Sequence, residues 1–109
     1  TTNTKALAVD RSGRILAQAS VPMQVTYPKP GWAEQSADAI WAGVLDVIAS
    51  VTATLSAPVA AIAISNQRES VVLWERATGA ALAPCVVWQC QRGNALVEQR
   101  AIERAQVVA

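Results

Sequence analysis

The chain has 109 residues, nine Lys and Arg against eight Asp and Glu, and a formal net charge of +1. This length allows one small domain with a hydrophobic core, and 52% hydrophobic with 16% charged residues argues against disorder. The near-neutral charge gives no electrostatic basis for binding nucleic acid or an anionic membrane. Because the sequence contains no His, Ser-His-Asp catalysis, Cys-His catalysis and His-ligated metals are excluded within these residues.

Cysteine use and the absence of long apolar runs predict a cytoplasmic protein. The spacing of Cys85 and Cys90 matches no zinc or redox motif, and free thiols fit a reducing compartment. No apolar run reaches the roughly 18 residues of a membrane span, and the polar N-terminus is unlike a signal peptide. Because the chain begins with Thr1 rather than Met, we expect residues upstream of it.

The first half of the chain predicts a hairpin and a helix. Residues 5–10 and 14–21 alternate as strands do, and Asp10 and Gly13 supply the chemistry of a tight turn between them. The proline-rich residues 22–32 predict a loop. Ser36 is a good N-cap for a helix of about five turns that Pro58 ends. The apolar residues at helical spacing are Ile40, Trp41, Val44, Leu45, Ile48 and Leu55.

The second half predicts a strand, a second hairpin and a helix. Residues 59–65 are almost wholly apolar, which is typical of a strand covered on both faces. Strand, helix and buried strand form a crossover with parallel pairing. Residues 71–74 and 85–88 predict a second hairpin, and residues 93–107 a helix that buries Leu96, Ile102 and Val97. The sequence therefore predicts an α/β fold with a mixed sheet.

Six polar residues, 65–70, follow the predicted buried strand. Ligands of open α/β sheets bind at this end of the strands. Arg68 offers hydrogen-bond donors and Glu69 offers acceptors, so the pair could grip vicinal hydroxyls. The alternative is a solvated loop with a local ion pair.

Two other places could carry chemistry. Hydroxyls and backbone N–H groups of residues 1–4, with Lys5 beside them, could cradle a phosphate in a tight turn; a frayed polar terminus is the alternative. Trp88 ends a predicted strand near the polar loop and could offer a flat apolar face to a sugar, whereas core packing is the alternative. Trp41 lies on the helix stripe and is expected in the core.

Several segments together resemble the N-terminal domain of FGGY carbohydrate kinases. They are Asn-Gln-Arg-Glu at 66–69 with the hairpin that follows, Thr-Gly at 78–79, and Val-Trp-Gln-Cys at 87–90. Gly-Trp-Ala-Glu-Gln at 31–35 and the N-terminal residues 1–5, which match the end of a phosphate-binding turn, add to the resemblance. It runs from Thr1 to about Arg104, and within the family the chain is most similar to glycerol kinases.

The resemblance implies a ribonuclease H-like/actin-like fold, with a crossover helix, in which two domains close on ATP. It implies an enzyme, a phosphotransferase that passes the ATP γ-phosphate to a hydroxyl of glycerol or a related polyol or sugar, with Mg²⁺. Arg68 and Glu69 would bind the acceptor hydroxyls, and Trp88 would pack against the acceptor carbons. The implied ATP phosphate-binding residues are Thr1, Thr2, Asn3 and Lys5.

The sequence also departs from the family pattern. The first strand with its Asp-x-Gly, the general-base Asp, the metal ligands and the whole C-terminal domain are absent from residues 1–109. The sequence therefore predicts a partial domain that is inactive alone. Gln91 stands where glycerol kinases carry Arg, so a xylulokinase-like or other sugar kinase stays an alternative. Two further alternatives are a non-catalytic actin-like scaffold and a passive module that replaces its missing strand by association; a homo-oligomer is left open.

Overall fold

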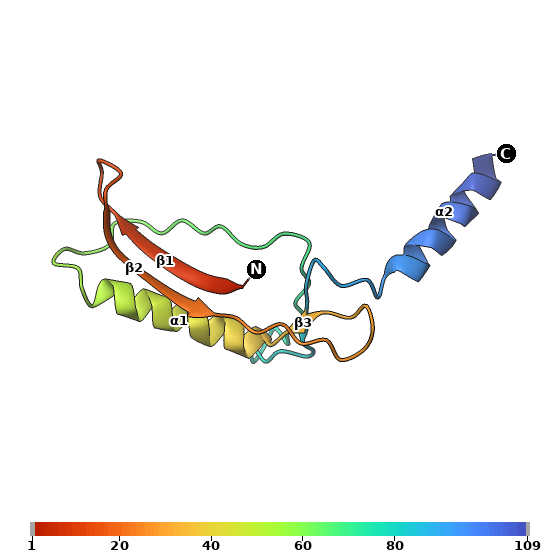
Figure 1. The fold of residues 1–109 in the computed structure, drawn as a ribbon, viewed down its shortest axis with the longest axis horizontal. Coiled ribbons are helices and arrows are strands. Elements are labelled where there is room, and N and C mark those ends of the chain that lie inside the picture. The colour runs from red at the N-terminus through yellow and green to blue at the C-terminus, as the bar shows by residue number, and fades with distance from the viewer. Residues whose placement is uncertain (1, 109) are drawn as a thin grey trace.

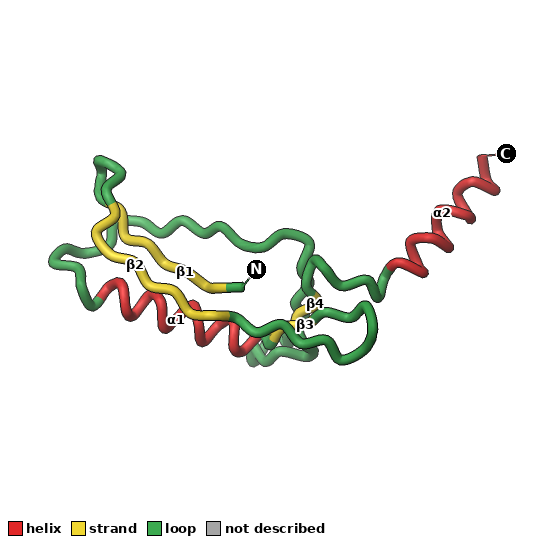
Figure 2. The backbone as a smooth tube through the Cα atoms, in the orientation of Figure 1, coloured by secondary structure: helices red, strands yellow, loops and turns green. Residues whose placement is uncertain are grey.

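The chain folds into two separate antiparallel strand pairs and two helices. A computed structural model describes residues 2–108, with side chains as far as residue 101. Strands β1 (Asn3–Val9) and β2 (Ile15–Pro22) form one sheet, and the short strands β3 (Glu34–Gln35) and β4 (Cys85–Val86) form another (Figures 1 and 2). The helices are α1 (Ala37–Thr52) and α2 (Asn94–Val108).

The hairpin of β1 and β2 confirms the first prediction. The Asp10 carboxylate accepts hydrogen bonds from the backbone N–H of Ser12 at 2.9 Å and of Arg14 at 3.0 Å. Gly13 takes a φ of 84°, which favours glycine. These local interactions fix the turn, and the register then runs to the pair Asn3↔Pro22.

Helix α1 begins as the sequence predicts, with the Ser36 hydroxyl accepting from the backbone N–H of Ala39 at 3.1 Å. Its buried face is Gly43, Val47 and Val51, at spacings of four residues, and this face packs on the hairpin. The helix approaches the hairpin so closely that a Cβ at Gly43 would lie 3.3 Å from the sulfur of Met23, the residue that follows β2, and 3.7 Å from the hydroxyl oxygen of Thr4 in β1.

The prediction that Trp41 belongs to the core is wrong. Its side chain is 62% exposed, and Leu45 and Ile48, which share a helical stripe with it at i+4 and i+7, are exposed as well. Among the described elements the hairpin is the main partner of α1, and it covers the face that carries Val47. The sequence showed a broad apolar stripe but not which part of it would be covered.

The second hairpin is present in an irregular form. Val71 and Val86 exchange both backbone hydrogen bonds, at 2.8 and 2.9 Å, and Trp74 forms a bridge with Ala81. The turn between them contains Gly79 at a φ of 74°. The pairing of β4 with β3 was not predicted, because a strand of two residues has no periodicity to detect.

The prediction of a buried strand at residues 59–65 is wrong. Figure 2 shows this segment as an extended loop, and its apolar side chains are exposed, to 87% at Ile64. No backbone hydrogen bond is found for it among the described residues, so the predicted parallel pairing does not form there. A strand needs a neighbour for its N–H and C=O groups, and within residues 2–108 β1 pairs with β2 alone.

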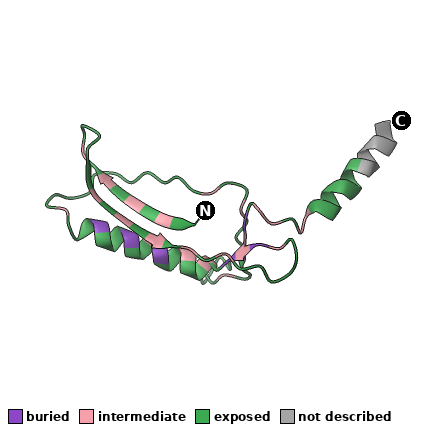
Figure 3. Cartoon of the chain, in the orientation of Figure 1, coloured by how far each residue is buried: buried purple, intermediate pink, exposed green. Residues whose placement is uncertain are grey.

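The core is smaller than the sequence predicts. The radius of gyration is 19.1 Å, against about 13 Å for a compact chain of this length. Helix α2 extends away from the rest (Figure 1), and Leu96 and Val97, which were expected to be buried, are exposed. Ile102 lies outside the described side chains. Burial is limited to α1 and the β3–β4 region (Figure 3); the buried apolar residues among those described are Ala33, Val47, Val51, Cys85 and Val87.

Candidate functional site

The polar loop at residues 65–70 contains a tight, unusual turn at Arg68 and Glu69. Arg68 and Glu69 are both exposed, and Glu69 has a φ of 57°. The left-handed region is uncommon for a residue with a side chain, and a residue held there costs of order 1 kcal/mol or more. No ion pair joins Arg68 to Glu69 in the described part of the chain, so the alternative of a local ion pair is not supported.

Two contacts hold this turn, one on each side. Before it, the Gln67 side-chain N–H donates to the side-chain oxygen of Gln35 at 3.2 Å. Gln35 belongs to β3 and is only 3% exposed. After it, Val71 and Val86 join the chain to β4. The turn that carries Arg68 and Glu69 is therefore tied to both strands of the small sheet.

Trp88 and the turn that carries Arg68 and Glu69 lie beyond the same end of the Val71–Val86 bridge. Glu69 is two residues before Val71, and Trp88 is two residues after Val86. Because the Val71–Val86 bridge is antiparallel, both positions lie beyond the same end of it. Trp88 is 54% exposed, so the alternative of a core residue does not describe it. No hydrogen bond joins Trp88 to Arg68 or Glu69 among the described residues.

Residues 3–5 of the segment predicted to bind phosphate, 1–5, belong to strand β1. The Thr2 carbonyl accepts from the backbone N–H of Met23 at 2.7 Å, and Asn3 opens β1, so neither a tight turn nor a frayed end is seen here. Asn3 and Lys5 are exposed on one face of β1, two residues apart. Lys5 lines a shallow hollow with Gln18. Thr1 lies outside the described residues.

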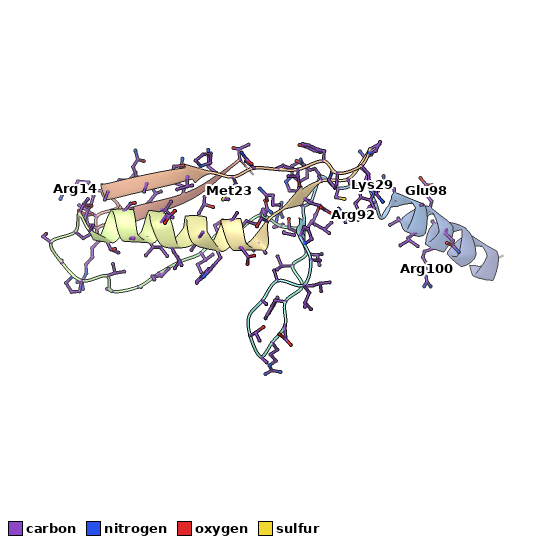
Figure 4. The ribbon with its side chains drawn as sticks, turned by 90° about the horizontal axis from the view of Figure 1, so that it is seen from below. Arg14, Met23, Lys29, Arg92, Glu98 and Arg100 are labelled. Atoms are coloured by element: carbon purple, nitrogen blue, oxygen red, sulfur yellow. The ribbon has the colours of Figure 1, made fainter. Side chains whose placement is uncertain are left out.

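A cluster around Trp32 was missed at the level of sequence. The guanidinium of Arg92 lies 3.9 Å from the centre of the Trp32 ring, and the ammonium of Lys29 lies 4.7 Å from it. Arg92 also forms an ion pair with Glu34 at 2.7 Å. Figure 4 shows Lys29 and Arg92 on neighbouring segments. The sequence offered only two motif segments quoted for the resemblance, 31–35 and 87–90, which the structure brings side by side: the Val87 backbone N–H donates to the Ala33 carbonyl at 3.3 Å.

The two cysteines are free and differ in their ionisation. Desolvation alone raises the pKa of Cys90, but hydrogen bonds from the backbone N–H groups of Arg92 and Ala33, together with the Arg92 side chain, lower it below its usual value. The Arg92 Nε–H donates to the Cys90 sulfur at 2.9 Å. Burial raises the pKa of the Cys85 thiol.

The described residues show neither a cluster of three metal ligands nor a helix that could span a membrane. Within the part of the chain that the structure describes, no three Asp, Glu or Cys residues gather as metal ligands. Neither helix, over its described residues, has the length and apolar character needed to cross a bilayer.

Comparison with known proteins gives a consistent result. Residues 1–107 match the FGGY family of carbohydrate kinases, N-terminal domain. The chain is 49% identical over 111 residues to an apulose kinase of Pectobacterium atrosepticum, covering 94% of this chain and 22% of the relative. It is 40% identical over 100 residues to a glycerol kinase of Nocardia farcinica, covering 89% and 20%.

A solved structure adds the fold. The crystal structure of Plasmodium falciparum glycerol kinase with ADP matches with a TM-score of 0.85 and 27% identity, over 93% of this chain and 21% of that one. The predicted α/β, ribonuclease H-like/actin-like class is confirmed by these matches. The chain spans about a fifth of the length of the curated relatives that it matches. It belongs to the FGGY family of carbohydrate kinases, in the N-terminal domain of that family.

Proposed function

We propose that this chain is the acceptor-binding part of an ATP-dependent kinase that phosphorylates a hydroxyl of glycerol or a related polyol or sugar. One observation carries the proposal. A turn with Glu69 in the left-handed region holds Arg68 and Glu69 exposed, without an ion pair to any described residue, at the end of the Val71–Val86 bridge where the exposed Trp88 also lies; the Gln67–Gln35 bond fixes the chain before the turn and the bridge fixes it after. Backbone strain of this kind concentrates at functional sites.

The proposed roles follow from the chemistry of the three side chains. The Glu69 carboxylate accepts hydrogen bonds from acceptor hydroxyls, and the Arg68 guanidinium donates to their oxygens. The indole face of Trp88 packs against the carbon skeleton. Together they hold one hydroxyl in line with the γ-phosphate, and positioning of this kind supplies much of the catalysis in phosphoryl transfer.

The ATP side of the reaction is proposed from the resemblance. Asn3 and Lys5, on one exposed face of β1, with Thr1 and Thr2, contact the phosphates, and the Lys5 ammonium offsets their charge. The resemblance places the general-base carboxylate and the Mg²⁺ ligands in parts of the longer protein outside these residues, and no group of three metal-ligating side chains occurs among the described residues. The free thiols of Cys85 and Cys90 suit a cytoplasmic enzyme.

The domain organisation is part of the proposal. The 109 residues form a partial N-terminal domain, and a further strand and a second domain of the longer protein complete the active site. The bare edge of β1 and the exposed apolar residues 59–65 support this, because both lack a neighbour among the described residues. A glycerol, apulose or xylulose acceptor is compatible with this arrangement, as is a homo-oligomer.

The test replaces Arg68 by Ala in the full-length enzyme. Loss of a charge-assisted hydrogen bond should cost about 1.5–3 kcal/mol in kcat/KM for the acceptor, with little change in the KM for ATP. Deoxy acceptors should fail strongly in the wild-type enzyme, because a polar clamp rejects analogues that leave it unpaired. Arg76→Ala is the matched control, since Arg76 is an exposed arginine in the turn at the far end of the same hairpin.

The outcome separates the enzyme from the scaffold alternative. Steady-state kinetics with glycerol, xylulose and apulose identify the acceptor class. If Arg68→Ala leaves kcat/KM unchanged for every acceptor that the wild-type enzyme uses, the role of Arg68 is disproved. If the full-length protein neither binds nor phosphorylates any of the three, as isothermal titration and ATP consumption would show, a non-catalytic scaffold replaces the kinase.

A further inference from the structure

The side chain of Gln35 is buried without belonging to the apolar core. It is the buried polar side chain among the described residues, and its amide oxygen accepts from Gln67, 32 residues further along the chain. Its backbone is fixed on both sides, because Gln35 pairs with Cys85 in the small sheet and Ser36 caps helix α1. Gln35 therefore presents a rigid acceptor to the polar loop.

The loop needs such an anchor. Glu69 sits at a φ of 57°, a conformation that persists only where its surroundings hold it. The Val71–Val86 bridge fixes the chain after Glu69, and the bond between Gln67 and Gln35 is the side-chain contact that fixes it before Arg68. Among the described residues, the side-chain hydrogen bond found within the loop itself is a long one, 3.4 Å, from the Ser70 hydroxyl to the Arg68 carbonyl.

We propose that Gln35 and Gln67 are positioning residues: their amide pair holds the turn in the conformation in which Arg68 and Glu69 grip the acceptor. This inference rests on the proposed function. Neither glutamine reaches the reacting atoms, and both act through the backbone of the loop. Without the pair, Glu69 relaxes toward a more common backbone conformation, and the carboxylate and guanidinium lose their fixed relative orientation. Acceptor affinity then falls, while the chemical step in the molecules that still bind is unchanged.

The experiment is kinetic and uses the full-length kinase. Gln35→Leu fills the buried space with an apolar side chain of similar size and leaves the half-buried Gln67 free to bond water, so folding is spared. We expect the acceptor KM to rise roughly three- to tenfold, as for one lost hydrogen bond, with kcat and the KM for ATP within twofold of wild type. Gln67→Leu removes the same bond from the other side. It should also raise the acceptor KM and leave kcat and the KM for ATP unchanged.

A double-mutant cycle separates positioning from general destabilisation. In an Arg68→Ala background, Gln35→Leu should raise the acceptor KM by a smaller factor than it does in the wild-type enzyme, because one of the two groups that the pair positions is gone. Val47→Ala, a core change beneath the hairpin, is the stability control and should lower Tm with an unchanged acceptor KM.

Failure of the proposed function and failure of the positioning role would give different results. If the wild-type protein phosphorylates no acceptor, the proposed function fails. If the wild-type protein is active, the positioning role is overturned by an unchanged acceptor KM in both glutamine variants. It is also overturned by an equal loss of kcat and acceptor affinity, or by effects of Gln35→Leu and Arg68→Ala that simply multiply.

Discussion

Arg92 makes three contacts with its side chain, and one of them has a chemical consequence. Its guanidinium stacks on Trp32, pairs with Glu34 and donates to the sulfur of Cys90. The donors around the Cys90 sulfur stabilise the thiolate more than desolvation opposes it, and the pKa lies below its usual value. Because only the thiolate is nucleophilic, the environment of Cys90 should be visible in its reactivity.

We predict that Arg92→Leu shifts the alkylation of Cys90 to higher pH. Removal of the guanidinium takes away a donor and a positive charge, so the pKa rises and less thiolate is present near neutral pH. The rate of iodoacetamide labelling, followed by peptide mass spectrometry from pH 6 to pH 10, should fall near pH 7 and converge with wild type near pH 10. Cys85, whose pKa burial raises, is the internal reference. An unchanged pH profile would contradict the role given to Arg92.

The start of helix α1 is stabilised by its N-cap residue, Ser36. Ser36 has an extended backbone, and its hydroxyl satisfies one N–H of the first turn. We expect Ser36→Ala to lower the free energy of unfolding of the full-length protein by about 1 kcal/mol, and Ser36→Asp to retain most of the stability because Asp also caps well. Urea titration measures the change. Ser50→Ala, an exposed serine within the same helix, should shift stability by less than about 0.5 kcal/mol; equal effects of the two alanine variants would argue against the cap.

Elements with local causes could be predicted from the sequence. The first hairpin follows from Asp10 and Gly13, the start of α1 from Ser36, and the second turn from Gly79, since each signal acts within a few residues. The candidate site was located by the polar loop and the family motifs. The residues that hold the Arg68–Glu69 turn in place could not be predicted. The Gln35–Gln67 bond joins residues far apart in the sequence, and no periodicity marks such a pair. The prediction of which helix residues are buried was wrong for the same reason. Whether Trp41 is buried depends on what packs against α1, and this contact is not local in the sequence.

At the scale of the whole molecule, the apolar residues 59–65 have the composition of a buried strand and the exposure of a loop. The edge of β1 away from β2 is equally bare among the described residues. Unpaired edges and exposed apolar runs favour association with another strand. On the proposed domain organisation, a strand of the longer protein lies between β1 and this segment and gives both a hydrogen-bonded neighbour.

Hydrogen exchange of the full-length protein tests that arrangement. The backbone N–H groups of residues 59–65 should exchange as slowly as those of β2, which are paired in the present structure and serve as the internal reference. Ile64→Asp should then destabilise the full-length protein by about 3 kcal/mol or more, because an unpaired carboxylate would be placed in a covered sheet. In the structure described above Ile64 is 87% exposed, and a surface substitution there would cost less than about 0.5 kcal/mol. Fast exchange across 59–65 together with a neutral Ile64→Asp would mean that no strand covers this segment.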